Sequence, residues 1–207
     1  MDVNKLIQEI IILAPPFLLG LTVHEYAHGY VAYRFGDPTA KAQGRLTMNP
    51  IKHIDPIGAL AFIIMKIGWA KPVPVNPAYF KNPARDMLWV SFAGPGANML
   101  TAIASGIILK LMLLLTGIVP MFIFMPVAKM LAASVWINVM LGIFNLVPIP
   151  PLDGSKIVVG LLPSEMAAAY AKLEPFGFVI LLVLFYTGVI SKVLLPLINF
   201  AQGLILG

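Results

Sequence analysis

The segment "HEYAH", residues 24–28, lies near the end of an apolar run, Leu6–Tyr33, that is long enough to be a membrane-spanning helix. Two histidines and a glutamate are costly in hydrocarbon, so ionisable groups at such a place are by default functional. His24 and His28 are four residues apart, which in a helix puts both imidazoles on one face. They can bind one metal ion, and Glu25 can take a proton from a water molecule there. The alternative is a histidine pair that packs between helices.

The composition excludes an ordinary soluble domain. Of the 207 residues, 59% are hydrophobic and only 11% are charged, and the mean hydropathy is +0.91. The length predicts one domain, residues 1–207. Cysteine is absent, which excludes thiolate ligands and disulfides. The pI of about 9.5 does not indicate nucleic acid, because the basic residues are concentrated in one loop between apolar runs.

Four apolar runs approach or exceed the ~20 residues that a spanning helix needs. They are Leu6–Tyr33, Met87–Leu115, Met121–Val147 and Phe176–Leu204. The first contains Pro15 and Pro16, and the last contains Gly188 and Pro196, so that it is either one span or two. We therefore expect an α-helical polytopic membrane protein with about four to five transmembrane segments.

The loop between the first two runs, residues 34–85, carries eight of the chain's fourteen Lys and Arg residues. Positive charge marks cytoplasmic loops, so we expect this loop in the cytoplasm and both termini outside. Within the loop, Ile57–Ile67 is apolar but too short to span, which predicts a re-entrant or interfacial segment. The stretches "GRLTMNP" (44–50) and "AKPVPVNP" (70–77) alternate weakly and are rich in proline, which predicts a small membrane-associated β element.

The stretch from Gly68 to Pro77 suggests a role in docking of an extended peptide. A strand edge can pair with the main chain of such a peptide whatever its side chains are. Prolines at 72, 74 and 77 remove donors from the strand and leave one side free to pair. The alternative is that these prolines only protect the edge from aggregation.

Catalytic zinc sites usually have three protein ligands and one open position. The best candidate for the third ligand is Asp153, which follows an apolar run and the proline-rich break "VPIPPLDG" (147–154). The topology puts this break at the same cytoplasmic depth as His28, and a broken helix at membrane depth is tolerated where it lines a protein cavity. Alternatively, Asp153 caps a short helix from Gly154 to Leu162, and both roles are compatible.

Three further polar residues are candidates for substrate binding. Asn145 could bond the scissile peptide or its oxyanion, or could satisfy carbonyls that Pro148 frees. Asn98 ends "GPGAN" (94–98), whose glycines permit close helix approach; an interhelical hydrogen bond explains it better than substrate contact. His53 could sense pH or gate substrate, although a loop histidine more often bonds backbone.

Three motifs in this order resemble the site-2 proteases, a family of zinc intramembrane metalloproteases. They are "HEYAH", "FAGPGAN" (92–98) and "FNLVPIPPLDG" (144–154). HExxH alone is moderately specific, but HExxH followed at this separation by N-x-x-P-x-x-P-L-D-G is a specific combination. The resemblance covers most of residues 20–160 and is to a minimal member, without room for a PDZ or C-terminal regulatory domain.

The resemblance implies a three-helix catalytic core in the membrane and hydrolysis of peptide bonds within or near transmembrane segments of other proteins. It assigns His24, His28 and Asp153 as ligands of one Zn²⁺ per chain, and Glu25 as general base. It also implies a multi-pass protein of the cell membrane with its active site toward the cytoplasmic side. The expected partners are the lipid bilayer and the substrate's transmembrane segment, with no nucleic acid; the oligomeric state is left open.

Two other classes of function are compatible with these residues. In a membrane metal transporter, the HEYAH side chains and Asp153 would form a transit site, but they cluster at one depth without a relay across the membrane. In a catalytically silent relative, the chain would be a binding scaffold, but every residue that hydrolysis needs is present. Replacing Glu25 separates enzyme from transporter, because a base that is not a ligand can be lost while zinc stays bound.

Overall fold

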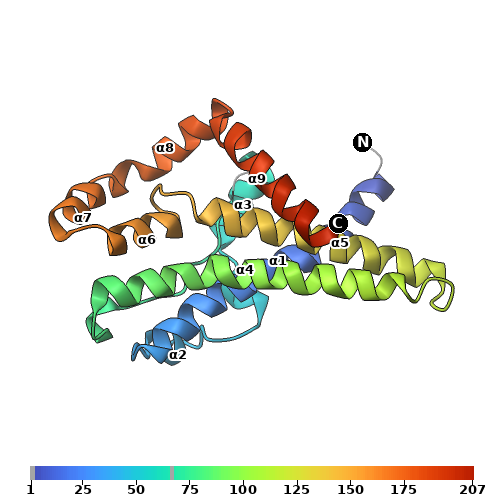
Figure 1. Cartoon of the computed structure of the whole chain (residues 1–207), viewed down its shortest axis with the longest axis horizontal. Coiled ribbons are helices and arrows are strands. Elements are labelled where there is room, and N and C mark those ends of the chain that lie inside the picture. Colours follow the sequence, from blue (N-terminus) through green and yellow to red (C-terminus); the bar gives the residue numbers. More distant parts are fainter. Residues whose placement is uncertain (1–2, 66–67) are drawn as a thin grey trace.

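The computed structural model describes residues 3–65 and 68–207, and nearly all of its regular structure is helical (Figure 1). Four helices are long and apolar enough to cross a membrane: α1 (Val3–Arg34, apolar from Ile7), α4 (Pro83–Leu113), α5 (Met121–Asn145) and α9 (Val189–Leu206). A fifth span is formed if α7 (Ser164–Ala171) and α8 (Glu174–Tyr186), which meet at 63°, count as one broken helix. The predicted number of four to five segments agrees with this.

The first apolar run is one continuous helix, because Pro15 and Pro16 lie inside α1 without ending it. A proline removes one backbone hydrogen bond, and membrane helices tolerate this where neighbouring groups satisfy the freed carbonyl. The last apolar run is two helices. α8 and α9 are separated at Gly188, whose φ of 73° is left-handed and so suits glycine.

Helices α1, α4 and α5 form the centre of the molecule. α4 and α5 lie side by side and antiparallel, joined by a short turn, and α1 packs against both (Figure 1). Small residues permit the close approach: a Cβ on Gly142 of α5 would lie 3.2 Å from the carbonyl oxygen of Pro95 on α4. This arrangement agrees with the three-helix core that the resemblance implies.

The three central helices bury many polar side chains beside apolar ones and expose large apolar side chains. Their buried polar side chains include Thr22, His24, Glu25, His28, Ser91, Asn98, Ser105, Ser134 and Asn138. Large apolar side chains such as Leu100 on α4 and Phe122 on α5 are exposed instead. This is the pattern of helices surrounded by lipid, where buried polar groups satisfy one another.

The described residues of the 34–85 loop do not show the predicted β element. Besides short helices α2 (Thr39–Ala42), η1 (Pro50–His53) and η2 (Pro77–Tyr79), the loop has one isolated bridge, between Ile54 and Ala70. In the described residues the segment 68–76 does not extend this bridge into a ladder, because Pro72 and Pro74 lack an N–H and the Val73 N–H bonds a side chain.

The short apolar run in the same loop forms helix α3 (Pro56–Met65). Its ten residues span only about 15 Å, too little to cross a membrane, as expected. Ile67, the end of the predicted re-entrant run, lies outside the described residues.

The proline-rich break and the short helix after it attach to the central helices. The break covers residues 146–152, and α6 (Asp153–Leu161) follows it and packs along α4. The turn into α6 is tight, since a Cβ on Gly154 would lie 2.3 Å from the carbonyl oxygen of Leu146. The break therefore brings the start of α6 close to the middle of the helix bundle.

Candidate metal centre

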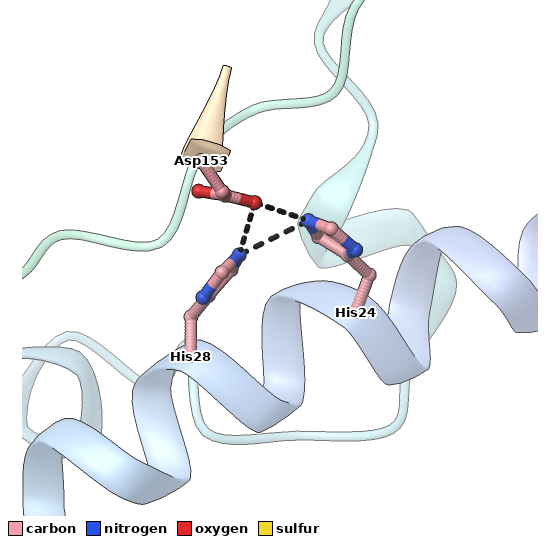
Figure 2. Close-up of side chains that lie close together, drawn as sticks. All are labelled: His24, His28 and Asp153. Carbon is pink, nitrogen blue, oxygen red and sulfur yellow. Dashed lines mark hydrogen bonds and ion pairs between the residues drawn. The ribbon is translucent and has the colours of Figure 1, made fainter. Parts of the chain in front are cut away.

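His24, His28 and Asp153 converge on one point (Figure 2). The two Nε2 atoms are 3.0 Å apart, and Asp153 Oδ2 lies 3.1 Å from each of them. All three residues are buried, with at most 9% of their surface exposed. The histidines share one face of α1, and the aspartate arrives from 125 residues beyond His28. In the part of the chain that the structure describes, this is the one group of three side chains arranged to hold a metal ion.

Asp153 does not cap the short helix. It is the first residue of α6, the cap position belongs to Leu152, and no side-chain capping bond forms at this end. The carboxylate turns instead toward the histidines, while its other oxygen, Oδ1, lies 3.9 Å from Lys156 Nζ. Burial raises the pKa of Asp153, but the hydrogen bonds and charges of the two histidines, in their protonated form, outweigh burial and hold that pKa well below its usual range; a bound cation would take the place of those protons. An ionised carboxylate is therefore available as a ligand.

The hydrogen bonds of the two imidazoles determine which nitrogen is free for a metal. His28 Nδ1 lies 2.7 Å from the Val90 carbonyl oxygen, and His24 Nδ1 lies 2.6 Å from Asn98 Oδ1. Both partners are acceptors, so both Nδ1 atoms carry the proton, and a neutral imidazole then has a lone pair at Nε2.

Two nitrogen lone pairs and a carboxylate oxygen thus face one another within 3.1 Å. Such an arrangement is repulsive unless a cation, either a proton or a metal ion, lies between the three atoms. Two histidines and one carboxylate are a common ligand set of catalytic zinc, and the Nδ1 bonds are of the kind that orient zinc ligands. The donor set therefore fits a zinc ion.

Glu25 is buried beside the first histidine but does not belong to the group of three. Its Oε2 accepts a hydrogen bond of 2.7 Å from the backbone N–H of Val73, which is also buried. The extended segment therefore holds one carboxylate oxygen of Glu25 in place. The N–H of Val73 is thus not free to pair with an unwound substrate, contrary to the docking hypothesis for that position.

Gly94 gives the histidines the space that they occupy. A Cβ at this position would lie 2.4 Å from His28 Nε2 and 2.7 Å from His24 Cε1. Gly96, two residues later in the same motif, is different: its Cβ would meet only Phe92, at an ordinary 3.6 Å. Of the two glycines, Gly94 is the one that the site needs.

The three candidates for substrate binding occupy different places. Asn98 is fully buried behind His24 and bridges helices, as its structural alternative predicts. His53 is also fully buried, and its Nε2 bonds the Thr47 carbonyl within the loop. Asn145 is half-buried, and its Nδ2 donates to the Leu141 carbonyl of its own helix rather than to a carbonyl freed by Pro148. These contacts provide no support for substrate binding by the three residues.

Two participants were not identified from the sequence. Asn138 of α5 accepts a hydrogen bond from Asn98. The sequence did contain a sign of this, because an amide side chain inside an apolar run needs a hydrogen-bond partner. Val73 contributes its backbone N–H, which bonds Glu25. Because every residue except proline has this donor, the residue type could not reveal its role.

Several known proteins are similar to this chain over most of its length. The model of Peptidase family M50 matches residues 111–186. "Putative zinc metalloprotease YwhC" of Bacillus subtilis is 43% identical over 200 residues, which cover 91% of this chain and 86% of the relative. "Putative zinc metalloprotease Rip2" of Mycolicibacterium smegmatis is 30% identical over 190 residues (88% of this chain, 69% of the relative). The Mycobacterium tuberculosis protein of the same name is 33% identical over 178 residues (82% and 64%). No solved structure matches significantly.

Proposed function

The chain belongs to peptidase family M50, and we propose that it is a zinc-dependent protease that hydrolyses peptide bonds within or near transmembrane segments of other proteins. Family membership confirms two predictions, the resemblance to site-2 proteases and the enzyme class of metalloprotease. Together with the apolar helices, it indicates a multi-pass membrane protein. The intramembrane substrate, the residue roles and the orientation are our proposals.

One observation carries the proposal: the convergence of His24, His28 and Asp153 beside a buried glutamate. Two imidazoles that turn their Nε2 atoms to one point and the carboxylate of Asp153 are the ligands we assign to zinc. Glu25 follows the first ligand directly and remains outside the ligand group, which suits a base that must exchange protons.

We assign the proton transfers to Glu25. Zinc, when bound, supplies a Lewis acid that polarises the scissile carbonyl and makes water acidic enough to attack near neutral pH. Glu25 accepts the proton of the attacking water and returns it to the leaving amine. The bond from Val73 holds Oε2, so the other oxygen, Oε1, is the atom that we assign to the proton.

The proposed substrate class follows from the position of the site. The two histidines lie on α1, which is long and apolar enough to cross a membrane, and His24 is nine residues, or about 14 Å of helix, before Tyr33. Peptide bonds that reach this depth belong to membrane-embedded segments. The eight basic residues of the 34–85 loop favour a cytoplasmic position for that loop, and hence an active site toward the cytoplasm.

The transporter alternative is not favoured. Transit across a membrane needs successive binding sites, and the described residues hold a single group of three such ligands. The histidines are also fixed through their Nδ1 atoms by Val90 and Asn98, which suits a permanently bound ion better than one in passage.

The decisive experiment is cleavage by the full chain, purified in detergent, of a panel of single-span substrates. We expect cleavage inside or beside the apolar segment, loss of cleavage with a chelator and recovery with added zinc. A water-soluble peptide with the same flanking residues but a polar centre serves as control. Equal cleavage of that peptide would reject the intramembrane specificity, and chelator-resistant cleavage would reject the zinc mechanism.

The orientation needs its own test. A cysteine introduced at Lys41, in a chain without native cysteine, should resist an impermeant thiol reagent applied outside intact cells and react after the cells are opened. Labelling from outside would place the loop, and the site with it, on the opposite side.

A further inference from the structure

We propose that Asn98 and Asn138 are positioning residues that fix the tautomer of His24, so that its Nε2 is always presented to the metal. This inference rests on the zinc site proposed above. It concerns two side-chain amides that we do not assign as metal ligands. It explains why the α1–α4–α5 bundle buries polar groups next to His24.

The two amides form a one-directional chain of hydrogen bonds across three helices. Asn138 Nδ2 on α5 donates to the Ser134 carbonyl at 2.9 Å, which turns Asn138 Oδ1 toward α4. That oxygen accepts from Asn98 Nδ2 at 2.9 Å, and Asn98 Nδ2 also donates to the Gly20 carbonyl of α1, again at 2.9 Å. Asn98 Oδ1 is left to accept from His24 Nδ1 at 2.6 Å.

The direction of this chain cannot be reversed without penalty. The Ser134 and Gly20 carbonyls are pure acceptors, so each amide must turn its NH₂ toward them. A flipped Asn98 would put its oxygen against the Gly20 oxygen and Asn138 Oδ1. Both asparagines are fully buried, so no water is at hand to compensate, and an unpaired buried group costs about 1–3 kcal/mol.

The consequence for His24 is chemical. With Asn98 Oδ1 as its partner, Nδ1 carries the proton and Nε2 keeps its lone pair for the metal. A flipped or missing amide would allow the other tautomer, in which the Nε2 proton points at Asp153 and excludes zinc. The Val90 carbonyl, a main-chain acceptor, holds the proton of His28 on Nδ1 in the same way. His24 is therefore the ligand whose tautomer depends on side chains.

His53 provides a natural reference within the same chain. Its Nε2 lies 2.9 Å from the Thr47 carbonyl, so Nε2 carries the proton, and its buried Nδ1 has no hydrogen-bond partner among the described residues. The structure thus predicts two histidines protonated at Nδ1 and one protonated at Nε2. Since the chain has three histidines, ¹⁵N spectra of histidine-labelled protein can distinguish them.

A purely structural bridge between helices is the competing explanation, and two substitutions of Asn98 separate it from ours. Asn98→Asp keeps an oxygen that accepts from His24 but loses the NH₂ donor, whereas Asn98→Leu loses both. If the amide only ties helices together, both variants should be equally damaging. If it sets the tautomer, Asn98→Asp should bind zinc nearly as wild type does, and Asn98→Leu should bind it about 10- to 100-fold more weakly.

The experiment uses the full zinc-loaded chain in detergent. Zinc affinity is measured by competition with a chelator, and ¹⁵N spectra are recorded near pH 8, both with zinc and after its removal. We expect His24 to lose its Nδ1–H signature in Asn98→Leu and to keep it in Asn98→Asp. Asn138→Leu should have a smaller effect on affinity, because the Gly20 carbonyl still holds Asn98. Thr101→Val, one turn along α4, removes a hydroxyl that bonds only its own helix and is the matched control.

The outcomes are distinct. The proposal fails if Asn98→Leu keeps the His24 Nδ1–H signature and binds zinc within threefold of wild type, or if Asn98→Asp is as weak as Asn98→Leu. Wild-type protein that binds zinc but cleaves no membrane segment would reject the proposed function. It would not affect the inference that Asn98 and Asn138 fix the tautomer of His24. Wild-type protein whose His24 is protonated at Nε2 would reject the amide chain, whatever its activity.

Discussion

The α1–α4–α5 bundle and the C-terminal helices α8 and α9 are both apolar in sequence but are built in different ways. The bundle buries many polar side chains, among them the candidate ligands His24 and His28. α8 buries only Gly177, and α9 buries only Leu194 and Ile198, which pack against Val135 and its neighbours. Tight contacts occur in both regions, since a Cβ on Gly177 would lie 2.1 Å from the Pro150 carbonyl oxygen. Apolar composition therefore indicates where helices lie, and buried polar groups indicate where the chemistry is.

The largest effect should come from Glu25→Gln, which tests whether the bundle contains the catalytic base. The amide keeps the size of the side chain and leaves the ligands untouched, but it cannot take a proton. We expect cleavage to fall by about 10²- to 10⁴-fold while bound zinc, measured by elemental analysis, stays stoichiometric. Near-normal cleavage would move the base elsewhere, and loss of zinc would make Glu25 a ligand.

Gly94→Ala tests whether the bundle really lacks space. The new methyl group would overlap the His28 ring, and overpacking of this kind costs about 1–3 kcal/mol, or roughly 5- to 150-fold in zinc affinity. Gly96→Ala in the same motif is the matched control, because its Cβ meets only Phe92 at van der Waals distance. Equal zinc affinities for the two variants would show that the site is looser than the structure indicates.

Val73→Pro tests the contact between the bundle and the extended loop segment. Proline suits an extended backbone but removes the N–H that holds Glu25, so we expect cleavage to slow by about 2- to 10-fold with unchanged zinc. Val75→Pro, two residues along, leaves that bond intact and should cleave normally. If both variants are slowed equally, the whole segment pairs with substrate, as the sequence suggested, and the Glu25 contact is not the cause.

The smallest effect is expected in α9, where Gly203→Ala adds a methyl group that meets no atom within 4 Å. Alanine favours helix over glycine by up to about 1 kcal/mol, so thermal stability in detergent should stay the same or rise slightly, with normal cleavage. A clear loss of stability would show that this face of α9 packs against something other than lipid, such as a second protein.

The sequence predicted most of the helices and the position of Asp153, because each has a local cause. The lengths of the apolar runs predicted the membrane-spanning helices, and the spacing of His24 and His28 predicted that they share one helix face. The proline-rich break predicted a segment that lines a cavity, where Asp153 meets the histidines. The predicted β element failed because alternation alone does not reveal where the partners of a strand's N–H groups are. The bond from Val73 to Glu25 could not be predicted, since it joins a main-chain atom to a side chain 48 residues away.

The distance along the chain between the candidate ligands has a consequence for biosynthesis. His24 and His28 are made early, whereas Asp153 follows His28 by 125 residues, after α4 and α5. A nascent chain that has inserted only its first helices therefore holds an incomplete site. The hydrolytic centre can be complete only after α6 has been synthesised and docked against the bundle. With the ligands that we propose, the order of synthesis thus delays proteolytic competence until α4, α5 and α6 have been made.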